Sequence, residues 1–279
     1  MKVLTHGKVK IAACQFAVSG DIRQNSQKMQ EYIRQAAEGG ADIVHFSECC
    51  LSGYAGTDFR GWYEFDWKSL EMETRSISKA ARKNRIYTVF GTATRAEGFE
   101  NPFNSLVMFD RDGNAAGVYH KRFCTPTDIR YYTPGDEFFT FELNGVKFAL
   151  LICYDLRFPE LYRRLCRMGV EAVIQSFYNA RQLKPSVHTD IMRQTMQCRA
   201  ATNYMWVSMT NSSAPISPYP SCFIRPDGVI AAQLEFNKPG MMINTIDTSQ
   251  KFYDASGPYR DLAIDGILTN RSMMPRNHI

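Results

Sequence analysis

The sequence lacks the features that mark membrane, secreted and nucleic-acid-binding proteins. No apolar run in it approaches the roughly 18 residues that a membrane-spanning helix needs. The opening stretch, MKVLTHGKVK, contains no apolar signal core, so we expect a cytoplasmic protein. Lysine and arginine are scattered and the net charge is only +5, whereas a nucleic-acid-binding face usually shows a dense basic stripe. We therefore expect neither a membrane nor a nucleic acid as a partner.

CxxC pairs, repeats and flexible linkers are missing as well. The eight cysteines include no CxxC pair, and neighbouring thiols such as Cys49 and Cys50 are poor zinc ligands, so we expect no metal site. A large cytoplasmic chain is not expected to rely on disulfides. No tandem repeat or Gly/Ser-rich stretch divides the 279 residues. We expect one domain over residues 1–279, in which a polar arm begins at about residue 247.

What the chain does contain is an alternation of apolar strand-like runs and amphipathic helical patterns. Helices are expected over residues 21–37, 69–84, 161–168 and 186–203. Strands are expected over residues 10–15, 43–46, 86–92, 105–109, 115–119, 147–153, 172–176, 205–209, 221–224, 229–232 and 241–246. The turns around Gly113 and Gly228 predict two hairpins. Helical crossovers and hairpins together predict α/β layers with mixed sheets.

Cys153 is the most informative residue. It ends the apolar run KFALLIC, and Pro159 and Glu160 soon after it suit the first turn of a helix. Cys153 is thus expected at the carboxyl end of a strand, facing a helix start that would stabilise a thiolate. A buried cysteine taken alone is more often an inert thiol. The position favours a nucleophile.

Two further ionisable residues follow strands in the same way, Glu48 after residues 43–46 and Lys121 after residues 115–119. A carboxylate could take the thiol proton and return one to a leaving amine. An ammonium, helped by the backbone N–H of Tyr154, could stabilise the oxyanion of a tetrahedral intermediate. A thiol could attack a carbonyl carbon and form a thioester.

Several segments together resemble one known family. They are SECCLSGY around Glu48, VYHKRF around Lys121 and LICYDLRFPEL around Cys153, with FNSLVMFDRDG, YYTPGDE and CRAATNYMWVSMTN elsewhere. On these segments the chain is similar to the nitrilase superfamily of carbon–nitrogen hydrolases, whose catalytic set is Glu, Lys and Cys in that order. Tyr-Asp after the cysteine resembles the amidase branches, including ω-amidase-like hydrolases of small aliphatic amides.

The resemblance implies a four-layer αββα sandwich with two mixed β-sheets, in subunits that form homodimers or higher homo-oligomers. It also implies that Glu48, Lys121 and Cys153 hydrolyse a non-peptide C–N bond without a metal or cofactor. The expected partner is a small-molecule amide that releases ammonia. An N-carbamoyl amide substrate and a non-catalytic binding protein are the alternatives.

The chain departs from the family pattern at three places. Ser47 stands where proline is common, and Asp128 stands nearest to the position of a second, supporting glutamate. Residues 175–179 read QSFYN where relatives usually carry Asn-Pro. By position, Tyr54, Phe177, Tyr178 and Asn179 are candidates for the substrate pocket. Packing between the layers is the alternative for all four.

Other polar residues near these motifs have simpler interpretations. His45, His120 and His188 leave a Cys–His site open, although a structural histidine is the more common case. The resemblance gives Asp155 a structural part near the helix start. Arg157 is expected to pair with Glu160, or else to bind a substrate carboxylate.

Overall fold

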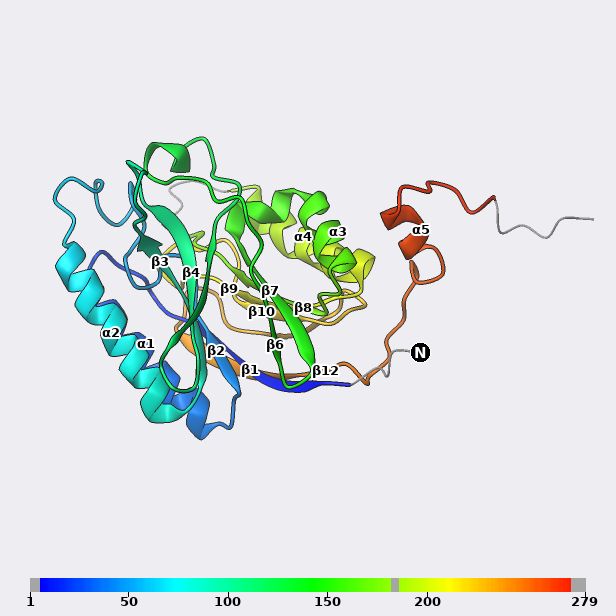
Figure 1. Ribbon diagram of the computed structural model, residues 1–279, viewed down its shortest axis with the longest axis horizontal. Helices are drawn as coiled ribbons and strands as arrows, with labels where there is room; N and C mark the ends of the chain where they lie inside the picture. Colours follow the sequence, from blue (N-terminus) through cyan, green and yellow to red (C-terminus); the bar gives the residue numbers. More distant parts are fainter. Residues whose placement is uncertain (1–5, 182–185, 272–279) are drawn as a thin grey trace, which may run out of the picture.

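The computed structural model of the chain describes residues 6–181 and 186–271, which form two six-stranded β-sheets (Figure 1). The first sheet contains, in spatial order, β12 (Gly240–Asp247), β1 (Lys8–Gln15), β2 (Ile43–His45), β3 (Tyr87–Thr94), β4 (Phe103–Phe109) and β5 (Ala115–His120). The second contains β11 (Ile230–Gln233), β10 (Cys222–Ile224), β9 (Trp206–Thr210), β8 (Ala172–Ser176), β7 (Val146–Ile152) and β6 (Thr140–Leu143).

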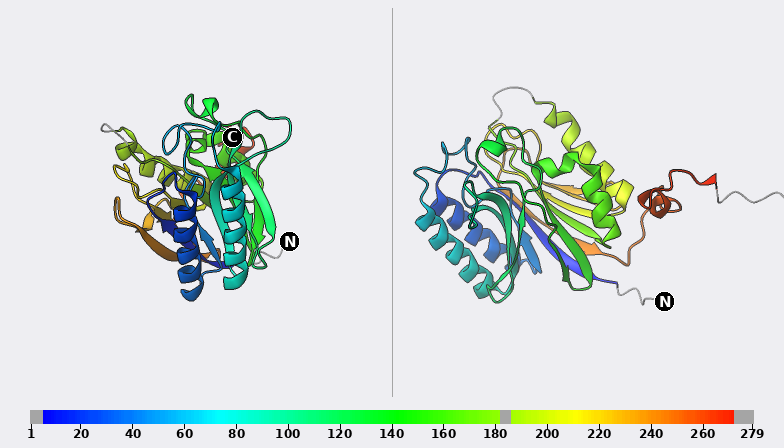
Figure 2. Two further views of the ribbon diagram at one scale, coloured as in Figure 1. Left: turned by 90° about the vertical axis from the view of Figure 1, so that its left-hand side faces the viewer. Right: turned by 45° about the horizontal axis from the view of Figure 1, so that its top comes forward.

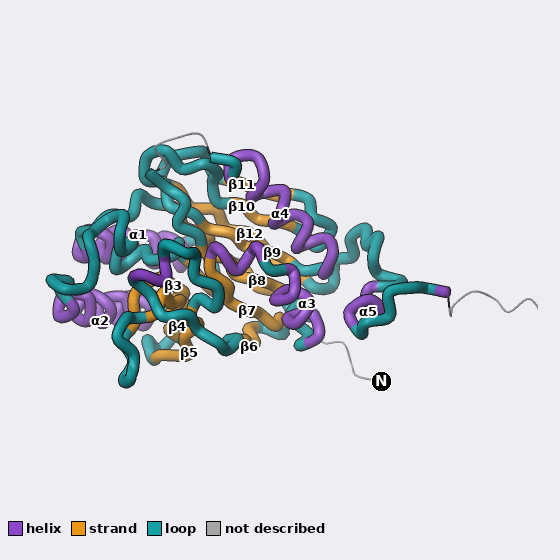
Figure 3. The backbone as a smooth tube through the Cα atoms, turned by 90° about the horizontal axis from the view of Figure 1, so that it is seen from above, coloured by secondary structure: helices purple, strands orange, loops and turns teal. Residues whose placement is uncertain are grey.

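Helices cover the outer face of each sheet, so the layers are helix, sheet, sheet, helix (Figures 1 and 2). The long helices are α1 (Ile22–Glu38), α2 (Trp67–Asn84), α3 (Pro159–Arg167) and α4 (His188–Asn203). Seen from above, α1 and α2 lie on one side of the strands and α3 and α4 on the other (Figure 3). The expected αββα sandwich is therefore confirmed.

Each sheet has a parallel centre and antiparallel edges. The strands β1, β2 and β3 run parallel through the crossovers α1 and α2, and β7, β8 and β9 do the same through α3 and α4. The hairpins β4–β5 and β10–β11 extend the edges, as their glycine turns predict. Because β5 runs parallel to β2, both strands end at the same edge of their sheet, and β7 and β8 end together at one edge of the other.

Local sequence explains the helix starts. The carboxylate of Asp21 accepts a hydrogen bond from the backbone N–H of Gln24, and Asp66 does the same for Ser69. Such caps satisfy N–H groups that have no partner within the helix. All four expected helices and all expected strands are present, and their ends differ from the expected ones by at most two residues.

Three elements differ from expectation. The edge strand β6 was not expected, because its half-exposed sequence TFEL has only a weak alternation. The segment after β12 leaves the sandwich (Figure 1) and contains the short helix α5 (Arg260–Ile264), where only irregular structure was expected. Helix α4 begins at His188, whose N–H donates to the hydroxyl of Ser186, and the neighbouring Pro185 lies outside the described residues. The single domain with a C-terminal arm stays a prediction.

Candidate active site

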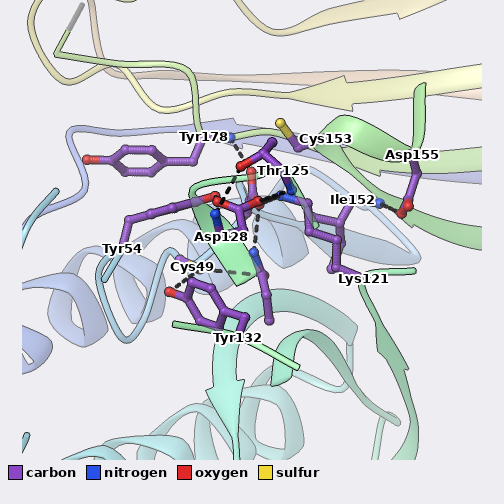
Figure 4. Close-up of polar contacts among 12 residues, drawn as sticks. Cys49, Tyr54, Lys121, Thr125, Asp128, Tyr132, Ile152, Cys153, Asp155 and Tyr178 are labelled. Atoms are coloured by element: carbon purple, nitrogen blue, oxygen red, sulfur yellow. Dashed lines mark hydrogen bonds and ion pairs between the residues drawn. The ribbon is translucent and has the colours of Figure 1, made fainter. Parts of the chain in front are cut away.

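Glu48, Lys121 and Cys153 come together where β2, β5 and β7 end. Figure 4 shows Lys121 and Cys153 in this site. Lys121 Nζ lies 2.8 Å from Glu48 Oε1, and both side chains are completely buried. The Glu48 carboxylate also interacts with the Cys153 thiol. Lys121 is 73 positions away from Glu48 in the sequence, and Cys153 follows a strand of the other sheet. The three side chains share one site because parallel strands of a sheet end at a common edge.

Lys121 is held between two carboxylates. Its Nζ donates to Glu48 Oε1 and to Asp128 Oδ2, each at 2.8 Å. Burial disfavours the ammonium, but the negative charges beside it, foremost that of Glu48 and then that of Asp128, outweigh burial and raise the pKa of Lys121 well above its usual range. Lys121 therefore remains charged at any ordinary pH.

Both oxygens of the Glu48 carboxylate are hydrogen-bonded. The side-chain amide of Asn104 donates to Oε1 at 2.7 Å, and the backbone N–H of Tyr178 donates to Oε2 at 2.8 Å. Burial raises the pKa of Glu48, while Lys121 and Asn104 act against that rise without cancelling it. A carboxyl group whose pKa is raised in this way is suited to accept and return a proton.

Cys153 begins the short 3₁₀ helix η2 (Cys153–Arg157) and has a φ of 41°, which only glycine adopts without strain. The Asn179 amide nitrogen lies 3.5 Å from its Sγ. Burial raises the pKa of the Cys153 thiol well above its usual value, and the Glu48 carboxylate adds to the rise. The expected thiolate is therefore wrong for the resting site, since burial and a neighbouring carboxylate outweigh the start of a five-residue helix.

Asp155 holds the turn that carries Cys153. Its carboxylate accepts hydrogen bonds from the N–H groups of Ile152 and Phe123, each at 3.0 Å, and from the Tyr119 hydroxyl at 2.7 Å. The Ile152 contact is visible in Figure 4. Asp155 thus has the structural part that the resemblance implies. Tyr154 follows in the first turn of η2, where N–H groups have no partner within the helix.

A pocket of about 220 Å³ opens beside Cys153. Its lining includes three of the four pocket candidates, Tyr54, Tyr178 and Asn179, together with Asp128 and Tyr154.

Phe177 does not line this pocket. Its side chain is fully buried in the core, with its ring edge-on to that of Tyr219. Phe177 directly follows the buried strand β8, and burial of its large apolar ring in the core is favourable. Phe177 contributes through its backbone instead, because its carbonyl accepts a hydrogen bond from the N–H of Glu48.

The three histidines do not pair with Cys153 in the described part of the chain. His45 bonds to the hydroxyl of Ser208 at 2.7 Å and His120 to that of Ser105 at 2.8 Å. His188 does line the pocket, but its Nδ1 lies 3.1 Å from the guanidinium of Arg157.

The expected pair of Arg157 with Glu160 is wrong. Within residues 6–181 and 186–271, Arg157 has no carboxylate within ion-pair distance, and its guanidinium turns to His188 in the pocket. The reason is that Glu160 lies at the exposed start of α3, whereas Arg157 precedes that helix and is half-buried.

Sequence reasoning missed two residues that hold this site together. Asn104, which orients Glu48, lies within FNSLVMFDRDG, so its segment was noticed but its contact was not. Asn211, the last residue of CRAATNYMWVSMTN, bonds to both the N–H and the carbonyl of Asn179 through its side-chain amide, so its segment too was noticed but its contact was not.

Two features are absent from the described residues. None of their helices is both long and apolar enough to cross a membrane. Nor do any three of their His, Cys, Asp and Glu side chains gather in a way that could hold a metal ion.

Comparison with known proteins identifies the family. The family model "Carbon-nitrogen hydrolase" matches residues 10–251. An "(R)-stereoselective amidase" of Pseudomonas sp is 31% identical over 69% of this chain and 66% of its own length. "Omega-amidase NIT2" of Mus musculus is 29% identical over 59% of this chain and 62% of its own. "Nitrilase homolog 2" of Dictyostelium discoideum is 28% identical over 59% and 52%. The chain thus spans about half to two thirds of these relatives.

Solved structures share the fold. A variant of the amidase from Nesterenkonia sp. AN1 in complex with butyramide has a TM-score of 0.76 at 20% identity, covering 94% of this chain and 98% of that one. Another variant of the same amidase, with the acetamide moiety of fluoroacetamide added covalently at its active site cysteine, has a TM-score of 0.78, also at 20% identity and the same coverage. The chain therefore belongs to the carbon–nitrogen hydrolase family, in the amidase-like branch of the nitrilase superfamily.

Proposed function

We propose that the protein is a thiol-dependent amidase that hydrolyses the C–N bond of a small linear carboxamide and releases ammonia. The observation that carries the proposal is the buried Lys121 ammonium, held at 2.8 Å by both Glu48 and Asp128 beside a cysteine at the mouth of a pocket. The amidase names among the relatives, and the butyramide bound by the Nesterenkonia enzyme, support an amide substrate.

In the first half of the reaction, Glu48 takes the proton of the Cys153 thiol as Sγ attacks the carbonyl carbon of the amide. Burial raises the pKa of both groups, so the thiol keeps its proton until the attack and Glu48 is a stronger base than an ordinary carboxylate. Glu48 then gives its proton to the leaving nitrogen. The C–N bond breaks, ammonia departs, and the acyl group remains on Cys153 as a thioester.

Lys121 and Tyr154 stabilise the oxyanion formed on the way. An ammonium has three N–H groups, and two of those on Lys121 are occupied by Glu48 and Asp128. The third is available for the carbonyl oxygen of the substrate, together with the backbone N–H of Tyr154. Asp128 has the supporting part that a second glutamate has in relatives.

In the second half, a water molecule attacks the thioester and Glu48 accepts its proton. The carboxylic acid product leaves and the proton returns to Cys153, so the thiol and the carboxylate are restored. The pocket of about 220 Å³, with the tyrosines Tyr54 and Tyr178 on its wall, suits a small acyl group.

A second candidate is an N-carbamoyl amino acid, which would release carbon dioxide as well as ammonia. The observation that favours it is the guanidinium of Arg157, which lines the pocket without a carboxylate partner in the described residues. A carboxylate on the substrate would supply that partner.

The test combines intact mass with product assays on a panel of small amides and N-carbamoyl compounds. The wild type should form an acyl adduct on Cys153 and release ammonia, whereas Glu48→Gln, which lacks the base of both half-reactions, should do neither. Carbon dioxide release would identify a carbamoyl substrate. Cys198→Ala, at an exposed cysteine, is the matched control for Cys153→Ala.

Ammonia release by Cys153→Ala would contradict the mechanism. A wild type that gives neither adduct nor ammonia, and whose Cys153 does not react with iodoacetamide, would favour a binding protein instead.

We further propose, from the family resemblance, a cytoplasmic homodimer or higher homo-oligomer. Light scattering coupled to size-exclusion chromatography measures the mass of the assembly, and a monomer at micromolar concentration would contradict this part.

A further inference from the structure

Asp58 is a buried carboxylate for which the reaction above has no use. Its side chain is 0% exposed, yet it lies on the loop that follows the Glu48 turn rather than within the core. Its Oδ1 accepts hydrogen bonds from the hydroxyl of Tyr178 at 2.8 Å and from Arg181 Nε at 3.1 Å. Its Oδ2 accepts one from the backbone N–H of Tyr54 at 2.9 Å. One carboxylate thus joins two loops about 120 positions apart in the chain.

Each tyrosine that Asp58 holds also touches one of the carboxylates around Lys121. The backbone N–H of Tyr178 donates to Glu48 Oε2 at 2.8 Å, and the hydroxyl of Tyr54 donates to Asp128 Oδ1 at 2.7 Å. The two rings pack against each other with centroids 4.9 Å apart, and both line the pocket. Figure 4 shows Tyr54 and Tyr178 on one side of the site, with Asp128 and Lys121 beside them.

We propose that Asp58 is a positioning residue, which fixes the Tyr54–Tyr178 wall so that its two hydrogen bonds hold Glu48 and Asp128 in their working positions. The inference rests on the proposed function, because the working positions are those of the amidase reaction. Asp58 could not be assigned this role from the sequence, because it belongs to none of the motifs and is 120 positions away from Tyr178.

The hydrogen bond from the Tyr178 N–H affects the protonation of the Glu48 carboxylate. An N–H that donates to a carboxylate favours the ionised form. If the loop of Tyr178 moves, Glu48 loses that donor, and its carboxylate becomes easier to protonate. The loss of the charge of Asp58 acts in the opposite direction, since removing a nearby negative charge favours ionisation of Glu48. The sign of the change in pH dependence therefore distinguishes positioning from a simple charge effect.

The other titratable groups around Glu48 are the same in the wild type and in Asp58→Asn. The charged ones are Lys121 and Asp128, and the thiols are Cys49, Cys124 and Cys153. The phenols are Tyr54, Tyr132 and Tyr219, and Asp58 itself faces Arg181 and Tyr178. Asp58→Asn changes the charge at this position and the position of the wall, and these two changes act on Glu48 with opposite signs.

The experiment measures kcat and KM against pH for the wild type, Asp58→Asn and Tyr178→Phe, with Asp66→Asn as the matched control. Asp66 caps α2 through the N–H of Ser69 and has no hydrogen bond to Tyr54 or Tyr178. We expect Asp58→Asn to lower kcat about tenfold to a hundredfold, with a smaller change in KM, and to move the acid limb of kcat/KM to higher pH. Asp66→Asn should leave the acid limb in place.

Tyr178→Phe keeps the ring but removes its hydrogen bond to Asp58, so it should move the acid limb in the same direction. If both residues act through one contact, the double variant should be no worse than Asp58→Asn alone. Tyr178→Phe also carries the test should Asp58→Asn fail to fold.

The rate of alkylation of Cys153 by iodoacetamide, followed by peptide mass against pH, repeats the comparison without a substrate. A wild type that releases no ammonia from any amide would refute the proposed function. The pH profile of alkylation would still test the positioning role of Asp58. An acid limb that is unmoved or moves to lower pH in Asp58→Asn, or that moves equally in Asp66→Asn, would overturn the positioning role.

Discussion

Asp128 Oδ2 lies 2.8 Å from Lys121 Nζ, although the aspartate is one methylene shorter than the glutamate expected near this position. The 3₁₀ helix η1 (Asp128–Arg130) makes this reach possible, because the N–H of Thr125 donates to the Asp128 carboxylate and the N–H of Asp128 donates to the Thr125 hydroxyl. The two reciprocal bonds pull the turn close to Lys121. A shorter side chain on a tighter turn can thus serve the same ammonium.

Asp128→Ala should lower the free energy of unfolding by about 3–5 kcal/mol, because it leaves a buried ammonium with one partner fewer. It should also reduce ammonia release, since Lys121 is no longer held toward the substrate. Urea denaturation and an ammonia assay measure the two effects. Asp112→Ala is the control. The side chain of Asp112 is 63% exposed and that of its ion-pair partner Arg85 is 70% exposed, so this variant should lose less than about 1 kcal/mol of unfolding free energy. Equal losses in the two variants would contradict the prediction.

His45 should make the protein less stable in acid. Burial lowers its pKa to about 3, against about 6.5 in the unfolded chain, so the unfolded state binds the proton first. As pH falls from about 6.5 toward about 3, the contribution of His45 should therefore reduce the free energy of unfolding by about 1.4 kcal/mol per pH unit.

The measurement is the difference in urea stability between the wild type and His45→Gln at pH 7, 5.5 and 4. His45→Gln should lose stability less steeply in acid than the wild type. Parallel curves would show that His45 is not responsible. His6→Gln, at an exposed histidine, serves as the control.

Arg157→Gln should separate amide substrates by charge. A charged hydrogen bond to a substrate carboxylate contributes about 1.5–3 kcal/mol, which corresponds to at least a tenfold rise in KM when it is lost. Neutral amides should be affected much less. Steady-state kinetics on a matched pair, one neutral and one carrying a carboxylate, checks this, with the exposed Arg164→Gln as control. Equal effects on both substrates would show that Arg157 does not bind the charged end.

Gly91→Ala should disturb the segment that carries Glu48. A Cβ at Gly91 would lie 2.3 Å from the backbone nitrogen of Cys49 and 2.5 Å from the carbonyl oxygen of Ser47, both too close for backbone atoms. We expect a loss of about 1–3 kcal/mol in unfolding free energy and a clear loss of ammonia release.

Gly61→Ala is the matched control for Gly91→Ala, since its new Cβ would meet only the Tyr131 ring at an ordinary 3.7 Å. It should keep activity near that of the wild type. A fully active Gly91→Ala would mean that the Glu48 segment tolerates displacement.

Much of the fold, and the candidate residues Glu48, Lys121 and Cys153, could be predicted from the sequence alone. The helix that begins after Asp21, the parallel strand before Cys153 and the hairpin at Gly113 depend on nearby residues: a cap, an apolar run and a turn. The order of Glu48, Lys121 and Cys153 within their motifs identified the family. The strand β6 escaped because its pattern is weak and its pairing with β7 supplies the order that its sequence does not.

Only the tertiary structure decided the protonation state of the site residues and which other residues form hydrogen bonds with them. The protonation of Cys153 depends on its burial and on Glu48, which is 105 positions away in the sequence. Cys153 is therefore a neutral thiol at rest, whereas its place before a helix start predicts a thiolate. Arg157 forms a hydrogen bond with His188 and no ion pair with the nearby Glu160, and Asp58 accepts a hydrogen bond from Tyr178, about 120 residues away. Local pattern determines where strands and turns form, because the forces that make them act between close neighbours. Burial, pKa and hydrogen-bond partners follow from distances that exist only once the two sheets have packed together.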